Sequence, residues 1–395
     1  MFLSYKERTI LFMNKRNIYL LFAIEWLQGM VFYGSIATLY RQSHGLSLVE
    51  MGLIESFFSI FVFILEIPMG YIGDRFGYKK TLISCYGLYF VSKIIFYQAY
   101  SFWMFLLERI LLALTVSGLS GCDSAFLYLS TGKMENPRIF GYYHACGVAG
   151  MMIASLTFSL WIQDVEKAAF LTIFPYLIAF GLSFFLNDIP VEKRENSHHL
   201  RSLFSDLWKQ KRIILFLIST AFILETTHTI SVFYNQIQWK ASHIPMIYFG
   251  WLAILMNFIP FCGAILGKLA QYIQEKQLMM GLISLCFLSC LVMGFYHIAW
   301  LSIAGVFILT FVEALYTPLS QSIMNHMVES HLRVTMLSIY SMIMNMVGVF
   351  TNMSFGVAGN QKIEWVMLLG ALFSLVSLLC YWKHMKGEKK NGNHI

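Results

Sequence analysis

The sequence predicts an all-α membrane protein with twelve transmembrane helices, arranged as two pseudo-symmetric bundles of six. Hydrophobic residues make up 58% of its 395 residues and charged residues only 12%, whereas a soluble domain carries about 25% charged residues. The mean hydropathy is +0.64. The chain also contains many apolar runs of the roughly 20 residues that a helix needs to cross the hydrocarbon of a bilayer. A membrane therefore supplies the apolar solvent that a soluble fold of this composition would lack.

Apolar runs separated by short polar loops predict the individual spans. In chain order they cover residues 17–39, 47–73, 81–100, 102–128, 138–162, 167–187, 211–236, 243–270, 276–296, 299–327, 334–358 and 362–383. The longest polar stretch, 188–210, falls after the sixth span. We therefore expect an N-terminal bundle (1–187), a cytoplasmic linker (188–210) and a C-terminal bundle (211–395).

The distribution of basic residues predicts the orientation. With the N-terminus in the cytoplasm, the inner loops and ends hold 22 Lys and Arg residues and the outer loops only 4. Cytoplasmic loops carry such an excess of positive charge. We expect a multi-pass protein of the inner or plasma membrane with both termini in the cytoplasm. Because the basic residues form no contiguous face, the net charge of +7 does not indicate a nucleic-acid partner.

The cysteines and the other potentially catalytic residues do not form known metal-binding or catalytic sequence motifs. The seven cysteines all lie in apolar runs, and none has metal-ligand spacing with a histidine. We expect them to be free packing residues, with no metal and no cofactor. The sequence contains no HExxH, GxSxG or phosphate-binding-loop motif. A membrane enzyme, or a membrane sensor that does not transport, is nevertheless one hypothesis for this chain. A sealed interface between the bundles would favour it.

The two halves repeat a short pattern at the same place. Ile67-Pro68 and Gly70 near the end of the second span recur as Ile259-Pro260 and Gly263 near the end of the eighth. The acidic residue that follows the first copy, Asp74, is missing from the second. Such a degenerate repeat half a chain away is what an internal duplication leaves.

The loop between the second and third spans resembles a signature of the major facilitator superfamily. The segment Gly70-Tyr-Ile-Gly-Asp-Arg-Phe-Gly-Tyr-Lys-Lys80 is similar to the pattern G-x-x-x-D-R-x-G-R-K, with Tyr78 in place of the first arginine. The preceding Glu66-Ile67-Pro68 resembles bacterial drug-efflux-like members. The resemblance implies a latch that holds the two halves together in one state of the transport cycle. Its residues would be Gly70, Asp74, Arg75, Gly77 and Lys79.

Two further segments resemble motifs of the superfamily in part. Arg109 to Ala113 in the fourth span is similar to R-x-x-x-G, which is linked to proton coupling, with alanine in place of glycine. Gly141 and Gly147-Val-Ala-Gly150 in the fifth span partly match the antiporter motif, whose proline is absent. The missing proline weakens the assignment as an antiporter and leaves the fold unaffected.

Ionisable residues inside the spans are the candidate site residues, because a charge within the bilayer usually faces a cavity or a partner. At about 1.5 Å per helical residue, Glu25, Glu225 and Glu313 lie midway along the first, seventh and tenth spans. In this superfamily, spans 1, 4, 7 and 10 line the central cavity. Arg109 would couple the three carboxylates; the alternative for each of the four residues is a structural role.

Neighbouring residues extend the candidate site. His228 follows Glu225 by one helical turn and could tune that carboxylate, or it could be a packing residue. The aromatic residues Trp26, Tyr33, Tyr234 and Tyr316 lie on the same spans and could line the cavity. Asp123 and Lys93 are expected to be structural.

These observations predict a secondary active transporter that moves a small organic molecule by alternating access. The leading hypothesis is a monomer that exports amphipathic or cationic compounds in exchange for protons. A buried carboxylate can exchange a proton for a cationic substrate. The alternative is an importer or facilitator of a polar metabolite, such as a sugar, an amino acid or an organic acid.

Overall fold

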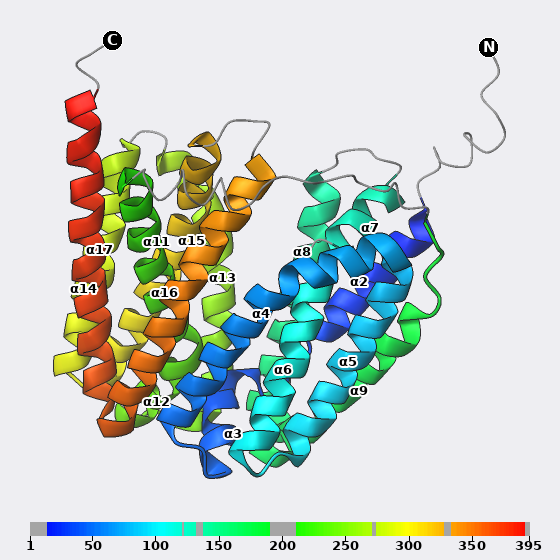
Figure 1. Cartoon of the computed structure of the whole chain (residues 1–395). Helices are drawn as coiled ribbons and strands as arrows, with labels where there is room; N and C mark the ends of the chain where they lie inside the picture. The colour runs from blue at the N-terminus through cyan, green and yellow to red at the C-terminus, as the bar shows by residue number, and fades with distance from the viewer. Residues whose placement is uncertain are drawn as a thin grey trace, which may run out of the picture. The chain divides into compact units, whose positions relative to one another are not determined.

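Helices make up the regular secondary structure of the residues that the computed structural model describes, which are 14–120, 122–131, 137–189, 211–270, 274–327 and 333–391. The chain divides into two compact units (Figure 1). Unit 1 comprises Met1–Gly45, Phe57–Glu195 and Phe249–Ile254, and unit 2 comprises Leu46–Ser56, Asn196–Tyr248 and Leu255–Ile395. The predicted linker 188–210 lies outside the described residues except for Asp188 and Ile189.

Unit 1 is built mainly from the helices of the first half of the chain. They are α2 (Lys15–Gly29), η1 (Gly34–Ile36), α3 (Ala37–Ser43), α4 (Leu48–Phe76), α5 (Tyr78–Gln98), α6 (Phe102–Leu119), α7 (Cys122–Ser130), α8 (Pro137–Thr157), η2 (Phe158–Ile162) and α9 (Val165–Ser183). Within this unit α2 packs against α8 and α9, and α5 packs against α6 and α9.

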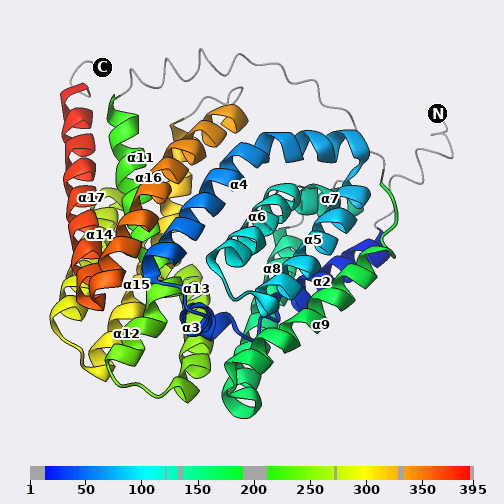
Figure 2. The ribbon, with the colours of Figure 1, turned by 60° about the horizontal axis from the view of Figure 1, so that its bottom comes forward.

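Unit 2 is built mainly from the helices of the second half. They are α11 (Lys211–Thr229), η3 (Ile230–Tyr234), α12 (Asn235–Ala241), η4 (Met246–Tyr248), α13 (Phe249–Ala270), α14 (Glu275–Phe295), α15 (Ala299–His326), α16 (Arg333–Gln361) and α17 (Ile363–Asn391). Here α17 packs against both α11 and α14, and α16 packs against α11 (Figure 2).

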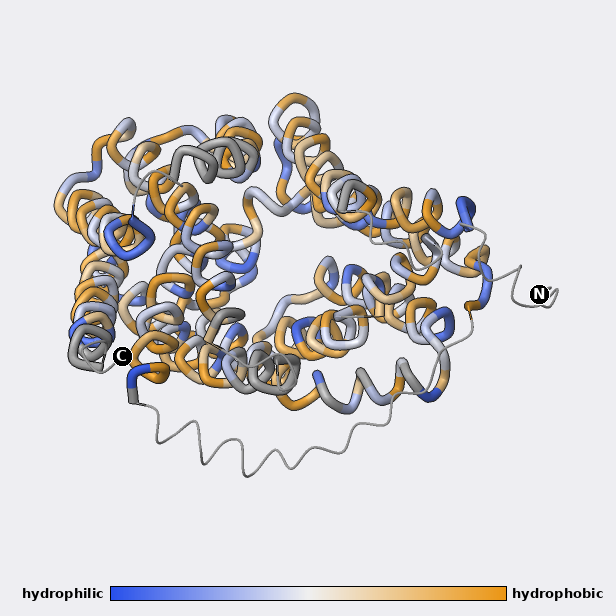
Figure 3. The backbone as a smooth tube through the Cα atoms, turned by 90° about the horizontal axis from the view of Figure 1, so that it is seen from above, coloured by the Kyte–Doolittle hydropathy of each residue, from blue (hydrophilic) through white to orange (hydrophobic). Residues whose placement is uncertain are grey.

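The observed helices follow the predicted spans. Ten helices in the described ranges are long and apolar enough to cross a membrane, and Met246–Pro260 is a shorter apolar helix. Hydrophobic residues predominate along the helices in Figure 3. The remaining predicted span, 81–100, is the 21-residue α5, which is less apolar than most of the others because it carries several tyrosines and Lys93. The count of twelve therefore agrees with the helices of the structure.

The fourth span is not a single helix as predicted. It consists of α6 and α7, with α6 ending at Leu119. The first span is also interrupted, between Gly29 and Gly34. The backbone groups freed there bond to α9: the Tyr176 hydroxyl donates to the Gln28 carbonyl (2.6 Å), and the Phe32 amide donates to the Thr172 hydroxyl (3.1 Å). A helix can break within a membrane only where neighbours satisfy its backbone in this way.

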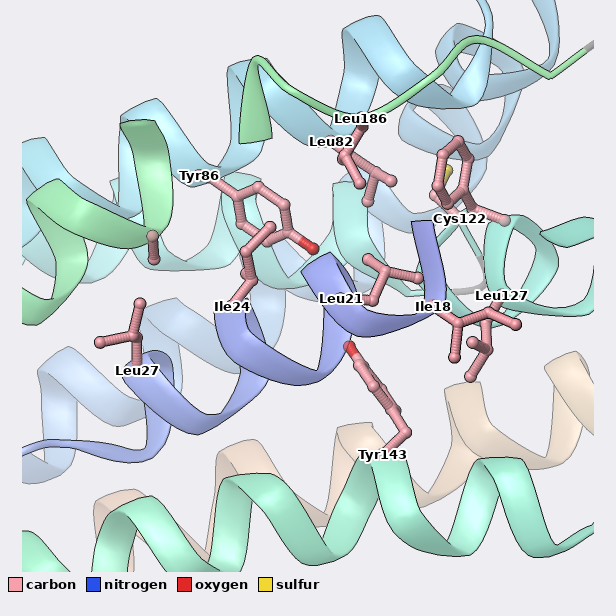
Figure 4. Close-up of a cluster of buried hydrophobic side chains, with 12 residues drawn as sticks. Ile18, Leu21, Ile24, Leu27, Leu82, Tyr86, Cys122, Leu127, Tyr143 and Leu186 are labelled. Carbon is pink, nitrogen blue, oxygen red and sulfur yellow. The ribbon is translucent and has the colours of Figure 1, made fainter. Parts of the chain in front are cut away.

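The core of unit 1 surrounds α2. Ile18, Leu21 and Ile24 of α2 pack with Leu82 of α5 and with further buried side chains of α5, α7, α8 and α9 (Figure 4). In both units, polar contacts join the first helix to the last. Asn17 exchanges two hydrogen bonds with the backbone of Asn187, and Ser219 of α11 and Ser377 of α17 bond through their hydroxyls at 2.8 Å. Such polar contacts stabilise helix pairs where packing against lipid provides little driving force.

The helices α4 and α13 each contribute to both units. The first residues of α4, up to Ser56, belong to unit 2, and the first residues of α13, up to Ile254, belong to unit 1. Gly52 of α4 lies directly on α16, where a Cβ would be 2.7 Å from the Asn352 carbonyl oxygen and 2.9 Å from the Gly356 Cα. Gly250 of α13 similarly lies against Ser155 and Ser159. Small residues permit such close backbone approach.

The predicted latch segment turns at Gly77, between α4 and α5. Gly77 caps α5 with φ of +90° and ψ of 144°, a conformation that glycine adopts without strain. Arg75, at the end of α4, lies over the rings of Tyr71 (6.0 Å) and Phe76 (5.7 Å). The role of Gly70, Asp74, Arg75, Gly77 and Lys79 as a latch stays a prediction, and the side chain of Asp74 lies outside the described residues.

Replacing Gly52 with valine is expected to destabilise the protein. Because the groups nearest to the new side chain are backbone atoms, relief requires a shift of α4 or α16, at a cost of about 1–3 kcal/mol. Thermal unfolding in detergent measures the loss. Gly141→Val is the matched control, because nothing lies within 4 Å of a Cβ at Gly141. An equal effect of both substitutions would contradict the assigned contact.

The N-cap of α9 predicts a pH-dependent contribution to stability. The Asp164 carboxylate accepts a hydrogen bond from the Lys167 amide (3.1 Å), and this bond holds the pKa of Asp164 below its usual value. Since the folded-state pKa is depressed, the contribution is present above the unfolded pKa and is lost as pH falls through the folded pKa. Thermal unfolding of Asp164→Ala should therefore show a deficit near neutral pH that shrinks in acid. A deficit that does not change with pH would argue against the cap.

Candidate functional site

A carboxylate of the first helix lies at the centre of a polar cluster in unit 1. Glu25 of α2 is hydrogen-bonded to Tyr143 of α8. The Tyr143 hydroxyl also lies 3.2 Å from Asp123 Oδ2 of α7, and Figure 4 shows the Tyr143 side chain pointing from α8 toward α2. His144 is close enough to Glu25 to interact electrostatically. One further acid (Asp123), a hydroxyl (Tyr143) and an imidazole (His144) therefore gather around the Glu25 carboxyl group.

The equivalent helix of unit 2 carries a second polar cluster. Glu225 of α11 interacts electrostatically with His228 and with Glu313 of α15. The Nδ1 of His228 lies 3.3 Å from Glu313 Oε1, so these two groups form a hydrogen-bonded pair. The His228 side chain is 53% exposed and the Glu313 side chain 30% exposed. His228 therefore contacts Glu313 directly, rather than only the Glu225 carboxylate that its spacing had suggested.

The carboxyl groups of Glu25 and Glu225 each lie against a glycine, Gly147 of the fifth span and Gly348 of the eleventh span. A Cβ on Gly147 of α8 would be 2.7 Å from Glu25 Oε1. A Cβ on Gly348 of α16 would be 2.8 Å from Glu225 Oε1. The glycine therefore leaves the space that the carboxylate occupies in each unit.

The local backbone is irregular beyond each of these carboxylates. In unit 1, α2 ends at Gly29 and the chain resumes a helical path at Gly34. In unit 2, the π-helical turn η3 (Ile230–Tyr234) follows α11. Interrupted helices and π-turns recur at binding sites in membrane transporters and other proteins. The two irregular segments therefore support functional roles for the polar clusters beside them.

Three of the four predicted aromatic site residues are buried. Tyr33 is 6% exposed, Tyr234 4% and Tyr316 0%. Tyr234 packs beside Gly359 and the ring of Phe355, and Tyr316 lies near the hydroxyls of Ser219 and Thr220. Trp26 is 37% exposed, beside Glu25 on α2. Trp26 is thus the only one of the four aromatic candidates with substantial exposure in its unit.

Arg109 belongs to a separate charge cluster in unit 1. Its Nε lies 3.9 Å from Glu108 Oε2, and its guanidinium lies over the Phe58 ring at 5.5 Å. Glu108 is 1% exposed and interacts electrostatically with Lys93, as do Arg109 and Arg41. The fourth span therefore places Arg109 beside a buried carboxylate of its own helix, within the charge cluster around Lys93.

A cage of tyrosines holds the Lys93 ammonium within this cluster. The ammonium donates a hydrogen bond to the Tyr33 hydroxyl (3.1 Å). It also lies 5.7, 5.0 and 4.9 Å from the ring centroids of Tyr33, Tyr89 and Tyr176. Cation–π contacts of this kind are worth about 2 kcal/mol or more when desolvated. Three tyrosine rings of unit 1 therefore enclose the Lys93 ammonium, and its structural role stays a prediction.

Sequence reasoning missed several residues of these clusters. It did not place Tyr143 or Gly348 in the site, and it considered Asp123 only as a structural residue. Gly147 was noted only as part of an incomplete antiporter motif. Glu225 follows Glu25 by 200 residues and Gly348 follows Gly147 by 201, whereas the Ile-Pro repeat of the second and eighth spans has an offset of 192, so the numbering alone did not pair these residues.

The fold is that of a multi-pass membrane protein with ten helices in the described residues long and apolar enough to cross a bilayer. Residues 18–351 match the family described as the Major Facilitator Superfamily. The chain belongs to this superfamily. No curated protein sequence matches the chain.

Solved structures of transporters share the fold. The nucleoside transporter NupG has a TM-score of 0.78 and 16% identity, with 94% of this chain and 99% of that chain covered. The POT family transporter PepTSo has a TM-score of 0.75 and 14% identity, with coverage of 95% and 98%. A bacterial homologue of the human lysosomal transporter Spinster, in an inward-facing and occupied conformation, has a TM-score of 0.70 and 13% identity, with 98% of both chains covered.

Removing the Lys93 charge should destabilise unit 1. Lys93→Met leaves Glu108 without one of its cations and empties the tyrosine cage, so the expected loss is about 3 kcal/mol. The double variant with Glu108→Gln should recover part of this loss. Unfolding in a denaturing detergent measures the stability of Lys93→Met, of Glu108→Gln and of the double variant. Lys240→Met, at an exposed lysine, is the control. Strictly additive effects of the two substitutions would contradict the interaction.

Proposed function

We propose that the chain is a proton-coupled secondary transporter that exports amphipathic or cationic organic compounds by alternating access. The observation that carries this proposal is the pair of first-helix carboxylates, Glu25 and Glu225. Each lies inside a membrane span with hydroxyl or imidazole groups as neighbours. The Lys93 and Arg109 cations of unit 1 interact instead with Glu108. Glu25 and Glu225 are thus suited to exchange a proton or bind a substrate cation.

The partly exposed acid groups Glu313 and Asp123 support a substrate with positive charge or hydrogen-bond donors. Glu313 and its partner His228 present a carboxylate and an imidazole at the surface of unit 2, and Asp123 and Tyr143 supply acceptors beside Glu25 in unit 1. Carboxylates accept hydrogen bonds only, unless they are protonated. A protonated amine or a compound with several N–H and O–H groups fits this chemistry better than an anion does.

The alternative is import of a polar metabolite. The chemistry of His228–Glu313 and Tyr143–Asp123 also suits a neutral compound rich in hydroxyl groups. The structural similarity to a nucleoside transporter adds nucleosides to the sugars and amino acids that such a site could accept. Substrate-stimulated proton uptake by intact cells would favour import with protons over export.

Transport by reconstituted protein tests the leading proposal. Proteoliposomes loaded with a panel of cationic dyes are expected to release them when a pH gradient is imposed. Glu25→Gln and Glu225→Gln should each lower this gradient-driven rate by about tenfold, which corresponds to a barrier higher by about 1.4 kcal/mol. Glu275→Gln, at an exposed position in the first turn of α14, is the matched control and should retain the wild-type rate.

The gradient itself decides whether transport is coupled to protons. Transport by the wild-type protein that proceeds at the same rate with and without the gradient would refute proton coupling. Full gradient dependence in both glutamine variants would refute the assigned roles of Glu25 and Glu225, whatever the substrate.

A further inference from the structure

The carboxylates Glu25 and Glu225 share a feature that goes beyond their position on first helices. Glu25 lies against Gly147 of the fifth span, and Glu225 against Gly348 of the eleventh. The helices involved pack against each other within each unit, as α2 with α8 and as α11 with α16. The two contacts thus join corresponding helices of the two halves, with carboxylates 200 and glycines 201 residues apart.

We propose that Gly147 and Gly348 are positioning residues. Each leaves the space that the carboxyl group of its own bundle occupies, Glu25 at Gly147 and Glu225 at Gly348, and we call this space the seat of that carboxyl group. This proposal deepens the proposed function and rests on it for the role of the seated groups. It makes Glu25 and Glu225 a matched pair of sites for a proton or a substrate ammonium, one in each half. Glu313 is then an auxiliary acid that holds His228 beside the second seat.

The geometry leaves no room for a side chain at either glycine. A Cβ on Gly147 would be 2.7 Å from Oε1 and 3.3 Å from both Cδ and Cγ of Glu25. A Cβ on Gly348 would be 2.8 Å from Oε1, 3.0 Å from Cδ and 3.3 Å from Oε2 of Glu225. Ordinary van der Waals contacts of a Cβ atom lie at 3.4–4 Å. Any side chain at these positions therefore displaces the carboxyl group itself.

Other glycines of the same units show that the close contact is specific. Gly141 lies on α8 less than two turns before Gly147, and nothing lies within 4 Å of a Cβ there. Gly281 of α14 is equally open in unit 2. Gly150, one turn after Gly147, meets the Trp26 carbonyl of α2 instead. Gly150 therefore permits the helices to approach, whereas Gly147 provides the space for the carboxyl group.

Carbodiimide labelling tests the positions of the carboxyls without any substrate. Dicyclohexylcarbodiimide reacts with protonated carboxyl groups in apolar surroundings, and peptide mass spectrometry quantifies the product at each glutamate. In membranes at neutral pH, Gly147→Ala should lower labelling of Glu25 by about tenfold, which corresponds to about 1.4 kcal/mol, and leave Glu225 unchanged. Gly348→Ala should do the reverse. Gly141→Ala and Gly281→Ala should change neither site.

Rescue separates positioning from a general packing defect. Combining Gly147→Ala with Glu25→Asp shortens the carboxyl side chain by one methylene and makes room for the new methyl group, so labelling at position 25 should return toward the wild-type value. The pair Gly348→Ala with Glu225→Asp should behave in the same way. The unaffected glutamate of the other unit reports in each sample that the protein is folded.

The outcomes distinguish this inference from the proposed function. Two results would overturn the proposal that each glycine positions its own carboxyl group. One is unchanged labelling of Glu25 in Gly147→Ala and of Glu225 in Gly348→Ala. The other is loss of labelling at both glutamates together in each variant. Site-specific loss with rescue supports them even if wild-type transport proves independent of the pH gradient, in which case only the proposed function fails.

Discussion

The free-energy cost of placing a carboxylate inside the hydrocarbon is the constraint on which the structure of both bundles depends. An acidic side chain within a span costs several kcal/mol unless neighbouring groups solvate it. The chain meets this cost in two ways. Glu108 is compensated by cations, since Arg109 is 3.9 Å away and Lys93 interacts with it from its tyrosine cage. Glu25 and Glu225 have neutral or titratable neighbours, and each carboxyl group occupies space left by a glycine of an adjacent helix. The first solution suits a permanent charge, and the second suits a charge that changes during a cycle.

The two bundles repeat this second solution with different partners. In unit 1 the hydroxyl of Tyr143 bonds to Glu25 from the neighbouring helix α8. In unit 2 the imidazole of His228 lies on the same helix as Glu225 and is bonded to Glu313. A duplicated scaffold thus retains the place of the carboxylate and of the glycine, while the groups that tune each acid have diverged. Such divergence gives the two carboxyl groups different chemical surroundings.

Much of the architecture could be predicted from the sequence because the hydrophobic requirement of a membrane span is strong and local. The twelve apolar runs agree with the helices of the fold. The interruptions were not predicted. The break after Gly29 depends on hydrogen bonds from Thr172 and Tyr176, which are about 140 residues away in the sequence. The candidate carboxylates were identified for the same reason as the spans, since a charge stands out in an apolar run. Their partners Tyr143 and Gly348 carry no such local signal, and Tyr33 and Tyr316 prove to be buried residues.

Infrared spectroscopy of the carboxyl groups tests the central claim most directly. Difference spectra of the reconstituted protein between acidic and neutral pH report the C=O stretch of protonated carboxyls in apolar surroundings. If Glu25 and Glu225 exchange protons within the membrane, the wild type shows bands in this region, Glu25→Gln and Glu225→Gln each remove a distinct component, and the double variant removes both. A spectrum that keeps every component in the double variant would contradict the account.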